Sequence, residues 1–271
     1  MSFDLGLTGE GGGQYIRYNA STGTVTITLT GRVWYLQAGA AGDGMNVLVI
    51  IPTYNEIENI QAIIEKVLSL KPDFHVLIVD DGSPDGTATE VKRLQILHPD
   101  QVFLLERQGK LGLGTAYIAG FRWALAKAYE FIFEMDADFS HNPSDLIKLY
   151  SACAIDGADF SIGSRYLNNK INVVNWDFKR LFLSYFASKY VRIITQIPIF
   201  DTTAGFVCYN RRVLEQIQLN KIKFIGYAFQ IEMKYRAYCK NLKIVEVPII
   251  FTDRTKGQSK MSNSIIKEAI F

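Results

Sequence analysis

The chain has 271 residues, of which 48% are hydrophobic and 21% charged, and this composition excludes extensive disorder. Its net charge of +2 says little about partners, and we expect no nucleic-acid partner. The three cysteines form no C-x-x-C pair, which favours a reducing, cytoplasmic location over a disulfide framework or a zinc site. We find neither a run of about 18 apolar residues nor a signal-like start, so we expect no membrane-spanning helix and no signal peptide.

The first 44 residues differ from the rest of the chain. They contain 10 of the 21 glycines, and polar and apolar residues alternate from Gly23 to Gly31 as in a β-strand. The stretch from Ala38 to Gly44 has the composition of a linker. We therefore expect residues 1–44 to form a β-rich appendage or fusion leader with a linker, and residues 45–271 to form the main domain.

Apolar runs alternate with helical patterns throughout residues 45–271. Strands are predicted at 47–51, 74–79, 102–105, 131–135, 159–163, 205–209 and 243–251. Helices are predicted at 56–70, 87–97, 115–129, 145–155, 176–195 and 228–239. Such alternation predicts an α/β fold with a mainly parallel, twisted sheet that is covered by helices on both faces. Ligands are then expected at the carboxyl ends of the strands.

The first of these strands ends in Ile51–Glu56, with the sequence I-P-T-Y-N-E. A dinucleotide-binding fold would need G-x-G-x-x-G here, so a nicotinamide or flavin enzyme is disfavoured. Pro52 fixes the backbone, Tyr54 offers a ring and Glu56 precedes the helix, which together suit the rim of a nucleoside site. The alternative is a plain helix start capped by Asn55.

The second strand ends in the paired carboxylates Asp80 and Asp81. They could bind a base or ribose, while Asp85 or Thr87 could simply cap the following helix.

A glycine-rich loop follows the third strand, from Arg107 to Gly114. Leu111 follows Lys110 where a P-loop requires Ser or Thr, so an NTPase is disfavoured. Lys110 then either approaches a diphosphate or belongs to an ordinary helix entry.

The strongest local signal lies at the end of the fourth strand, where Asp136 and Asp138 follow an apolar run. Strand alternation puts both carboxylates on one side, so they can converge on one hard cation, Mg²⁺ or Mn²⁺. Such an ion can neutralise the charge of a leaving nucleotide. Helix capping or surface solvation is the alternative for a lone Asp-x-Asp.

The predicted helix at 176–195 mixes aromatic and basic residues. The stretch from Arg165 to Arg192 contains six basic residues and one acidic residue, which suits an anionic phosphate or membrane, or else a solvated basic face. The helix is expected either to pack on the core or to lie on a membrane surface. A further apolar segment at 265–271 is consistent with a membrane-anchoring partner or a missing C-terminal anchor.

Five motifs, in order along the chain, resemble those of glycosyltransferase family 2, and within it those of the dolichol-phosphate (polyprenol-phosphate) mannose synthases. The motifs are Pro52–Glu56, Val79–Thr87, Gly112–Gly114, Glu134–His141 and Gly163–Tyr166. The resemblance covers residues 45–271. It implies a GT-A fold with a Rossmann-like nucleotide-binding half, and a metal-dependent, inverting transfer of a sugar to a lipid phosphate.

The resemblance also implies residue roles. It places four residues around the nucleotide, Pro52, Tyr54, Glu56 and Asp81. It assigns Asp136 and Asp138 to the metal. Ser140 stands where some relatives carry Gln. It implies that Arg165, Arg180 and Ser184 bind the acceptor phosphate. It also implies that Gln230 and Glu232 contact sugar hydroxyls, and that Arg254 and Lys260 contact donor phosphates. Lys110 is a further candidate near the diphosphate.

We expect mannose from GDP-mannose to pass to a polyprenyl or dolichyl phosphate at the cytoplasmic face of a membrane, where the enzyme is peripheral. A phosphate monoester is already anionic near neutral pH, so the acceptor needs no strong general base. Two alternatives stay open. One is a UDP-sugar-dependent, glucose-type transferase acting on polyprenyl phosphate or a polysaccharide, and the other is a non-catalytic module that binds nucleotide sugars.

Overall fold

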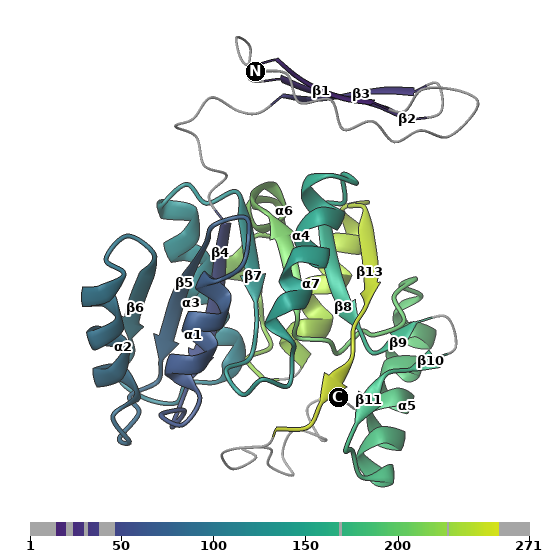
Figure 1. Ribbon diagram of the computed structural model, residues 1–271. Helices are drawn as coiled ribbons and strands as arrows, with labels where there is room; N and C mark the ends of the chain where they lie inside the picture. Colours follow the sequence, from purple (N-terminus) through teal and green to yellow (C-terminus); the bar gives the residue numbers. More distant parts are fainter. Residues whose placement is uncertain are drawn as a thin grey trace. The chain divides into compact units, whose positions relative to one another are not determined.

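The computed structural model describes residues 15–19, 24–29, 32–37, 47–167, 170–226 and 228–254 (Figure 1). The chain divides into two compact units, residues 1–45 and 46–271, and each is described by itself. In the first unit, β1 (Tyr15–Asn19), β2 (Thr24–Leu29) and β3 (Arg32–Gln37) form an antiparallel sheet in that order. The strand β2 confirms the strand predicted between Gly23 and Gly31.

The second unit is built on a seven-stranded sheet with the order β13-β8-β12-β7-β4-β5-β6. Its strands are β4 (Val47–Thr53), β5 (Phe74–Asp80), β6 (Val102–Glu106), β7 (Phe131–Glu134), β8 (Phe160–Ser164), β12 (Val207–Asn210) and β13 (Ile244–Pro248). All neighbouring pairs are parallel except those of β12, which is antiparallel to both β7 and β8. The predicted, mainly parallel sheet is therefore confirmed.

Helices cover both faces of this sheet (Figure 1). One face is covered by α1 (Ile60–Leu68), α2 (Thr87–Leu97) and α4 (Leu146–Ala154). The other carries α3 (Leu113–Ala126), α5 (Phe178–Thr195), α6 (Arg211–Ile217) and α7 (Ala228–Cys239). Among the described residues, no helix has both the length and the apolar character needed to cross a bilayer.

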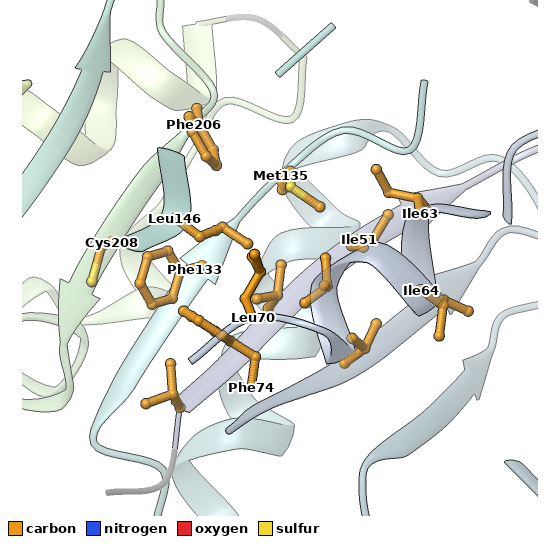
Figure 2. Packing of buried hydrophobic residues seen from close by; sticks show 14 of the residues in the cluster. Ile51, Ile63, Ile64, Leu70, Phe74, Phe133, Met135, Leu146, Phe206 and Cys208 are labelled. Carbon is orange, nitrogen blue, oxygen red and sulfur yellow. The ribbon is translucent and has the colours of Figure 1, made fainter. Parts of the chain in front are cut away.

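The core explains why the strands read as continuous apolar runs. In β4, Val49 and Ile51 pack with α1 and α4, whereas the alternate residues Leu48 and Ile50 pack with α3 on the opposite face. Because both faces are covered, neither face of the strand can be polar. Figure 2 shows the first of these clusters, in which Ile51 lies beside Ile63 of α1.

Several predicted boundaries shift for local reasons. The helix predicted from residue 56 begins at Ile60, because a turn precedes it in which the N–H groups of Asn59 and Ile60 both donate to the Glu56 carbonyl. The helix predicted from residue 145 is preceded by the short 3-10 helix η1 (Pro143–Asp145), and Pro143 suits such a first turn. The strand predicted at 243–251 is split, because β13 ends at Pro248 and β14 (Phe251–Thr252) joins a different sheet.

The sequence patterns missed α6, the 3-10 helix η2 (Leu219–Lys221) and the short strands β9 (Tyr166–Leu167), β10 (Lys170–Ile171) and β11 (Val173–Val174). The helix α6 follows β12 without a loop and is capped by Asn210, whose side chain accepts a hydrogen bond from the Arg212 N–H at 3.2 Å. The strand β11 pairs in parallel with β14. This pairing brings the chain near residue 252 beside the start of α5.

Candidate active site

The predicted functional motifs gather at one edge of the sheet. Because β4, β5, β6, β7 and β8 run in the same direction, their carboxyl ends all lie along that edge. The segments that follow these ends contain Tyr54, Asp81, Arg107, Asp136 and Arg165. These residues therefore lie at the carboxyl edge of the sheet, where ligands of such sheets commonly bind.

Asp136 and Asp138 follow β7 and differ in their surroundings. Asp138 is buried, accepts a hydrogen bond from the Ser140 N–H at 3.0 Å, and pairs through Oδ2 with Nη2 of Arg254 at 2.7 Å. Asp136 lies deep among protein atoms, yet 40% of its side-chain surface is accessible. Burial, followed by the nearby charge of Asp138, raises the pKa of Asp136 to about 7.

The two aspartates offer a donor set that suits a hard divalent cation. Burial opposes ionisation of Asp138, but hydrogen bonds from Ser140 and the charge of Arg254 lower its pKa overall. Among the described residues, no group of three or more His, Cys, Asp or Glu side chains is arranged for a metal ion. Two carboxylates still fit Mg²⁺ or Mn²⁺, since such ions commonly take their other ligands from water and substrate phosphates.

His141 lies directly behind the aspartates. Its ring stacks on Phe206 with centroids 4.8 Å apart and meets the edge of Phe251 at 5.2 Å. Its Nδ1 accepts the Asp136 N–H at 3.5 Å, and burial lowers the pKa of His141 to about 4. A neutral imidazole therefore supports the backbone of Asp136 at neutral pH, a role that was not predicted.

The three residues predicted to hold the acceptor phosphate lie around Trp176 and Tyr166. The guanidinium carbon of Arg180 lies 4.3 Å from the centroid of the Trp176 ring, and that of Arg165 lies 5.5 Å from the same centroid. Ser184 accepts a hydrogen bond from the Tyr166 hydroxyl at 2.9 Å. The fold thus brings together residues that lie up to 19 positions apart in the sequence.

Both arginines form ion pairs. Arg165 donates from Nε and Nη2 to the two carboxylate oxygens of the buried Asp201, each at 2.7 Å, and from Nη2 to Thr203 at 2.9 Å. Arg180 donates from Nη1 to Asp253 at 2.8 Å. The alternative of structural ion pairs therefore describes both contacts, and Arg180, whose side chain is 32% exposed, is the more accessible of the two.

The two residues after β14 contact Asp138, which follows β7, and Arg180 of α5. Asp253 pairs with Arg180, while the adjacent Arg254 pairs with Asp138. Backbone hydrogen bonds hold this short segment, because the N–H of Thr252 donates to Ser140 and the N–H of Asp253 donates to Val174. Arg254 was expected at a donor phosphate and here contacts a candidate metal ligand.

Four of the residues predicted around the nucleotide lie in the loops that follow β4, β5 and β6, namely Tyr54, Glu56, Asp81 and Lys110. Lys110 Nζ lies 5.3 Å from the centroid of the Tyr54 ring. Glu56 is buried and accepts a hydrogen bond from the Asn59 amide at 3.1 Å. Pro52 lies within β4, opposite Val79 of β5.

Asp81 is held by Arg107, which was not predicted to have a role. Arg107 donates from Nε and Nη2 to the two oxygens of Asp81 at 2.7 and 3.0 Å, and from Nη1 to Thr115 at 2.9 Å. This fork fixes the start of the glycine-rich loop against the end of β5. Asp85 accepts hydrogen bonds from the N–H and hydroxyl of Thr87, the first residue of α2, while the N-cap position itself is taken by Gly86.

Comparison with known proteins identifies the family. The model of the family described as Glycosyl transferase family 2 matches residues 48–218. The chain is 48% identical to the polyprenol monophosphomannose synthase of Mycolicibacterium smegmatis over 224 residues, which cover 83% of this chain and 84% of the relative. The chain belongs to glycosyl transferase family 2. It is also 43% identical to the undecaprenyl-phosphate mannosyltransferase of Micrococcus luteus over 226 residues, covering 83% of this chain and 91% of that protein.

Solved structures with low sequence identity share the fold of this family 2 glycosyltransferase. A glucosyl-3-phosphoglycerate synthase from Mycobacterium tuberculosis, in complex with Mn²⁺, UDP and glucosyl-3-phosphoglycerate, gives a TM-score of 0.61 at 16% identity, covering 86% of this chain and 80% of that one. A mannosyltransferase from Pyrobaculum calidifontis, in complex with GDP-Man and Mn²⁺, gives 0.51 at 20% identity, covering 79% and 58%. The fold is thus the GT-A fold expected from the sequence motifs.

Gln230 and Glu232 do not share one environment in this family 2 enzyme, because residues two apart on a helix point to different sides. Gln230 is buried, donates to Glu134 from Nε2 and accepts from Lys234 at 3.2 Å. Glu232 accepts hydrogen bonds from the N–H groups of Lys223 and Phe224 at 2.8 and 3.0 Å. Their predicted contacts with sugar hydroxyls stay a prediction, and the predicted phosphate contact of Lys260 falls outside the described residues.

A buried polar network lies behind the aspartates and was also not predicted. Glu134, the last residue of β7, accepts from the Tyr209 hydroxyl at 3.3 Å as well as from Gln230. Lys234 is fully buried and donates to the Ala204 carbonyl at 2.7 Å. Burial raises the pKa of Glu134 to about 7 and lowers the pKa of Lys234 to about 8. The network connects α7 to β7, the strand that precedes Asp136.

Proposed function

We propose that this glycosyltransferase moves mannose from GDP-mannose to a polyprenyl phosphate, with inversion at the anomeric carbon. Both curated relatives are named for a mannosyl transfer involving a polyprenyl lipid, and one neighbour of the same fold holds GDP-Man. The observation that carries the proposal is the single segment Asp253–Arg254, which contacts both Asp138 and Arg180. Donor and acceptor phosphates can therefore meet at one place.

The roles of the residues follow from their charges. Asp136 and Asp138 would hold Mg²⁺ or Mn²⁺, which stabilises the negative charge of the departing nucleoside diphosphate. Lys110 and Arg254 would contact the diphosphate, with Tyr54 and Glu56 at the nucleoside. An oxygen of the lipid phosphate forms the new bond to the anomeric carbon as the bond to the donor diphosphate breaks. Arg180 and Ser184 orient that phosphate, and Arg165 supports them from its pair with Asp201.

We further propose that α5 rests on a membrane surface. Phe178 and Phe182 expose 73% and 54% of their surfaces, and the ring of Phe182 lies 4.2 Å from that of Phe186. These three residues recur every fourth position, so they form one apolar stripe, here called the aromatic stripe. Lys189 lies on the same helix and adds positive charge, which suits an anionic lipid surface.

A test of the transfer begins with the purified protein, Mg²⁺, polyprenyl phosphate and a panel that includes GDP-mannose, UDP-glucose and UDP-galactose. Mass spectrometry of the lipid products should show a hexose added from GDP-mannose, and NMR should show the β-anomer. Asp136→Ala should abolish turnover while circular dichroism shows an intact fold. A lipid product formed only from a UDP-sugar, or full activity of Asp136→Ala, would contradict the proposal.

A further inference from the structure

Lys234 of α7 is fully buried, which is rare for a lysine, and the proposed transfer makes no use of it. Its ammonium has three N–H groups and finds three acceptors. They are the carbonyl of Ala204 at 2.7 Å and the backbone and side-chain oxygens of Gln230, both at 3.2 Å. The bonds to Gln230 stay within α7, whereas the bond to Ala204 reaches a different part of the chain. Lys234 therefore holds the segment Asp201–Phe206 against α7.

The segment Asp201–Phe206 leads into β12 and is fixed at two points. At its start, the N–H of Asp201 donates to a carboxylate oxygen of Glu246 in β13 at 2.9 Å. Three residues later, Ala204 accepts the hydrogen bond from Lys234, and its own N–H donates back to the carbonyl of Asp201 at 3.4 Å. The lysine thus acts on the same short turn that carries the Asp201 carboxylate.

Asp201 in turn fixes Arg165. Its carboxylate accepts the backbone N–H of Arg165 at 2.9 Å and the side-chain Nε and Nη2 groups at 2.7 Å each. Because a guanidinium is a rigid fork, the position of this carboxylate sets the direction of the Arg165 side chain. Arg165 and Arg180 both lie against the ring of Trp176. A displacement of the turn would therefore move Arg165 relative to Arg180, which is proposed to bind the acceptor phosphate.

The charge of Lys234 also acts on this site. Burial has the largest effect on the pKa of Lys234 and lowers it, the carboxylates of Glu134, Asp201 and Glu246 oppose this decrease, and the charge of Arg165 adds to it. An uncharged side chain in place of Lys234 would leave these carboxylates with one cation fewer. Buried charges are screened by little water, so the loss would be felt at the neighbouring acceptor site.

We propose that Lys234 is a positioning residue for the acceptor, which fixes the turn that begins at Asp201 and thereby aligns Arg165 for the acceptor phosphate. This inference rests on the proposed function for the identity of the acceptor. An apolar side chain is easier to bury than an ammonium. What the lysine adds is a donor for the Ala204 carbonyl and a positive charge behind Asp201. Being fully buried, it acts through Asp201 and touches no substrate.

The first test compares two neighbouring, fully buried residues of α7 by steady-state kinetics. Lys234→Met keeps the length of the side chain but removes its charge and donors, whereas Met233→Ala removes packing and no donor. We expect Lys234→Met to raise KM for polyprenyl phosphate about tenfold, because a hydrogen bond from a charged group is lost, and to leave KM for GDP-mannose unchanged. Met233→Ala should destabilise the fold without changing either KM, since unfolded molecules lower the apparent kcat alone.

The second test needs no turnover. The N–H of Arg165 donates to Oδ2 of Asp201, so its hydrogen exchange reports whether Asp201 stays in place. Lys234→Met should speed exchange of this amide about tenfold relative to other amides of the sheet, and Met233→Ala should not. Mass spectrometry of fragmented peptides measures the rate. If Lys234→Met does not fold, its combination with Glu134→Gln, which removes a buried carboxylate as well, takes its place with the same expected results.

Unchanged exchange at Arg165 in Lys234→Met would overturn the proposal, and so would faster exchange with an unchanged KM for polyprenyl phosphate. An equal rise in KM for both substrates, or the same rise in Met233→Ala, would overturn it as well, because it would indicate a general loosening of α7. A failure of the unaltered protein to transfer any sugar would instead refute the proposed function. Faster exchange together with weaker binding of polyprenyl phosphate, measured in detergent by isothermal titration calorimetry, would then still support the role of Lys234.

Discussion

At the scale of single residues, the two ion pairs of Asp253 and Arg254 balance charge within the candidate site. Arg254 gives Asp138 a positive partner, and Asp253 neutralises Arg180. Each of these contacts uses a group that the proposed substrates or metal would also use. Binding therefore requires an exchange of partners, and the cost of that exchange is part of the measured affinity.

The pair between Asp253 and Arg180 gives the first prediction. Asp253→Asn should lower KM for polyprenyl phosphate about three- to tenfold, because the carboxylate no longer competes with the acceptor for the guanidinium, and a part-exposed pair is worth about 1 kcal/mol. Steady-state kinetics at low ionic strength measures the change. Asp100→Asn, an exposed residue far along the chain, is the control for net charge, and a similar decrease there would contradict the explanation.

Gly114 gives a second prediction about stability. A Cβ at this position would lie 2.8 Å from Cγ of the buried Phe229, whereas a Cβ at Gly205 would meet only the Gln230 amide at 3.7 Å. Gly114→Ala should lower the free energy of unfolding by about 1–3 kcal/mol, since the ring cannot move without disturbing the core. Gly205→Ala should change it much less. Urea unfolding of both variants tests this, and equal losses would show that the contact with Phe229 is not responsible.

At the scale of elements, α5 has two functions in our proposals, because one flank faces the acceptor site and the other faces outward. The hydroxyl of Ser188 and the side chain of Val191 are buried, while the aromatic stripe is exposed. A helix that only packed on the core would have polar residues on its outer face. Under the proposed function, the acceptor phosphate and a bilayer would both lie next to this helix.

The aromatic stripe gives a third prediction. The double variant Phe182→Glu and Phe186→Glu should reduce binding to vesicles of phosphatidylcholine with about one-third phosphatidylglycerol at least tenfold, because each buried ring contributes about 1.5–3 kcal/mol. Sedimentation with vesicles measures the bound fraction. Ile96→Glu on α2 changes a residue that is 81% exposed and lies outside the stripe, so its binding should match the unaltered protein. An equal loss of vesicle binding in the double variant and in Ile96→Glu would indicate that the added negative charge alone weakens binding.

Most elements could be predicted because their signals are local. The boundaries of α2 and α7 match the helical patterns, since Asp85 and Gly86 mark the start of α2 and a helical period runs through α7. The missed strands β9, β10 and β11 are only two residues long, and such pairs are fixed by tertiary contacts and not by a local pattern.

The candidate site was predictable only in part. The chain itself places carboxylates after apolar strands, so Asp136 and Asp138 could be found from their neighbours in sequence. The pairs of Arg165 with Asp201 and of Glu134 with Gln230 join residues 36 and 96 positions apart, and no local pattern indicates such partners. The burial of Lys234 could not be foreseen either, because lysine is rarely buried and its acceptor, the Ala204 carbonyl, lies 30 positions away in the sequence.

At the scale of the whole molecule, the two units give a fourth prediction. The second unit has both faces of its own sheet covered by its own helices, so removal of residues 1–44 should leave its fold intact. We propose that residues 45–271 alone carry the transfer activity. Thermal unfolding and the GDP-mannose assay on the shortened chain test this. A loss of cooperative unfolding, or of activity with an unchanged fold, would show that the first unit contributes.

The reversed direction of β12 has a consequence for how such enzymes can diversify. Because β12 starts where β7 and β8 end, the segment Asp201–Phe206 enters the sheet from the catalytic edge. Asp201 and Thr203 in this segment hold Arg165, whereas the aspartate pair follows a different strand. Under the proposed residue roles, substitutions or insertions between α5 and β12 would change acceptor choice without disturbing the strand that precedes the aspartate pair, so donor chemistry and acceptor preference could evolve separately.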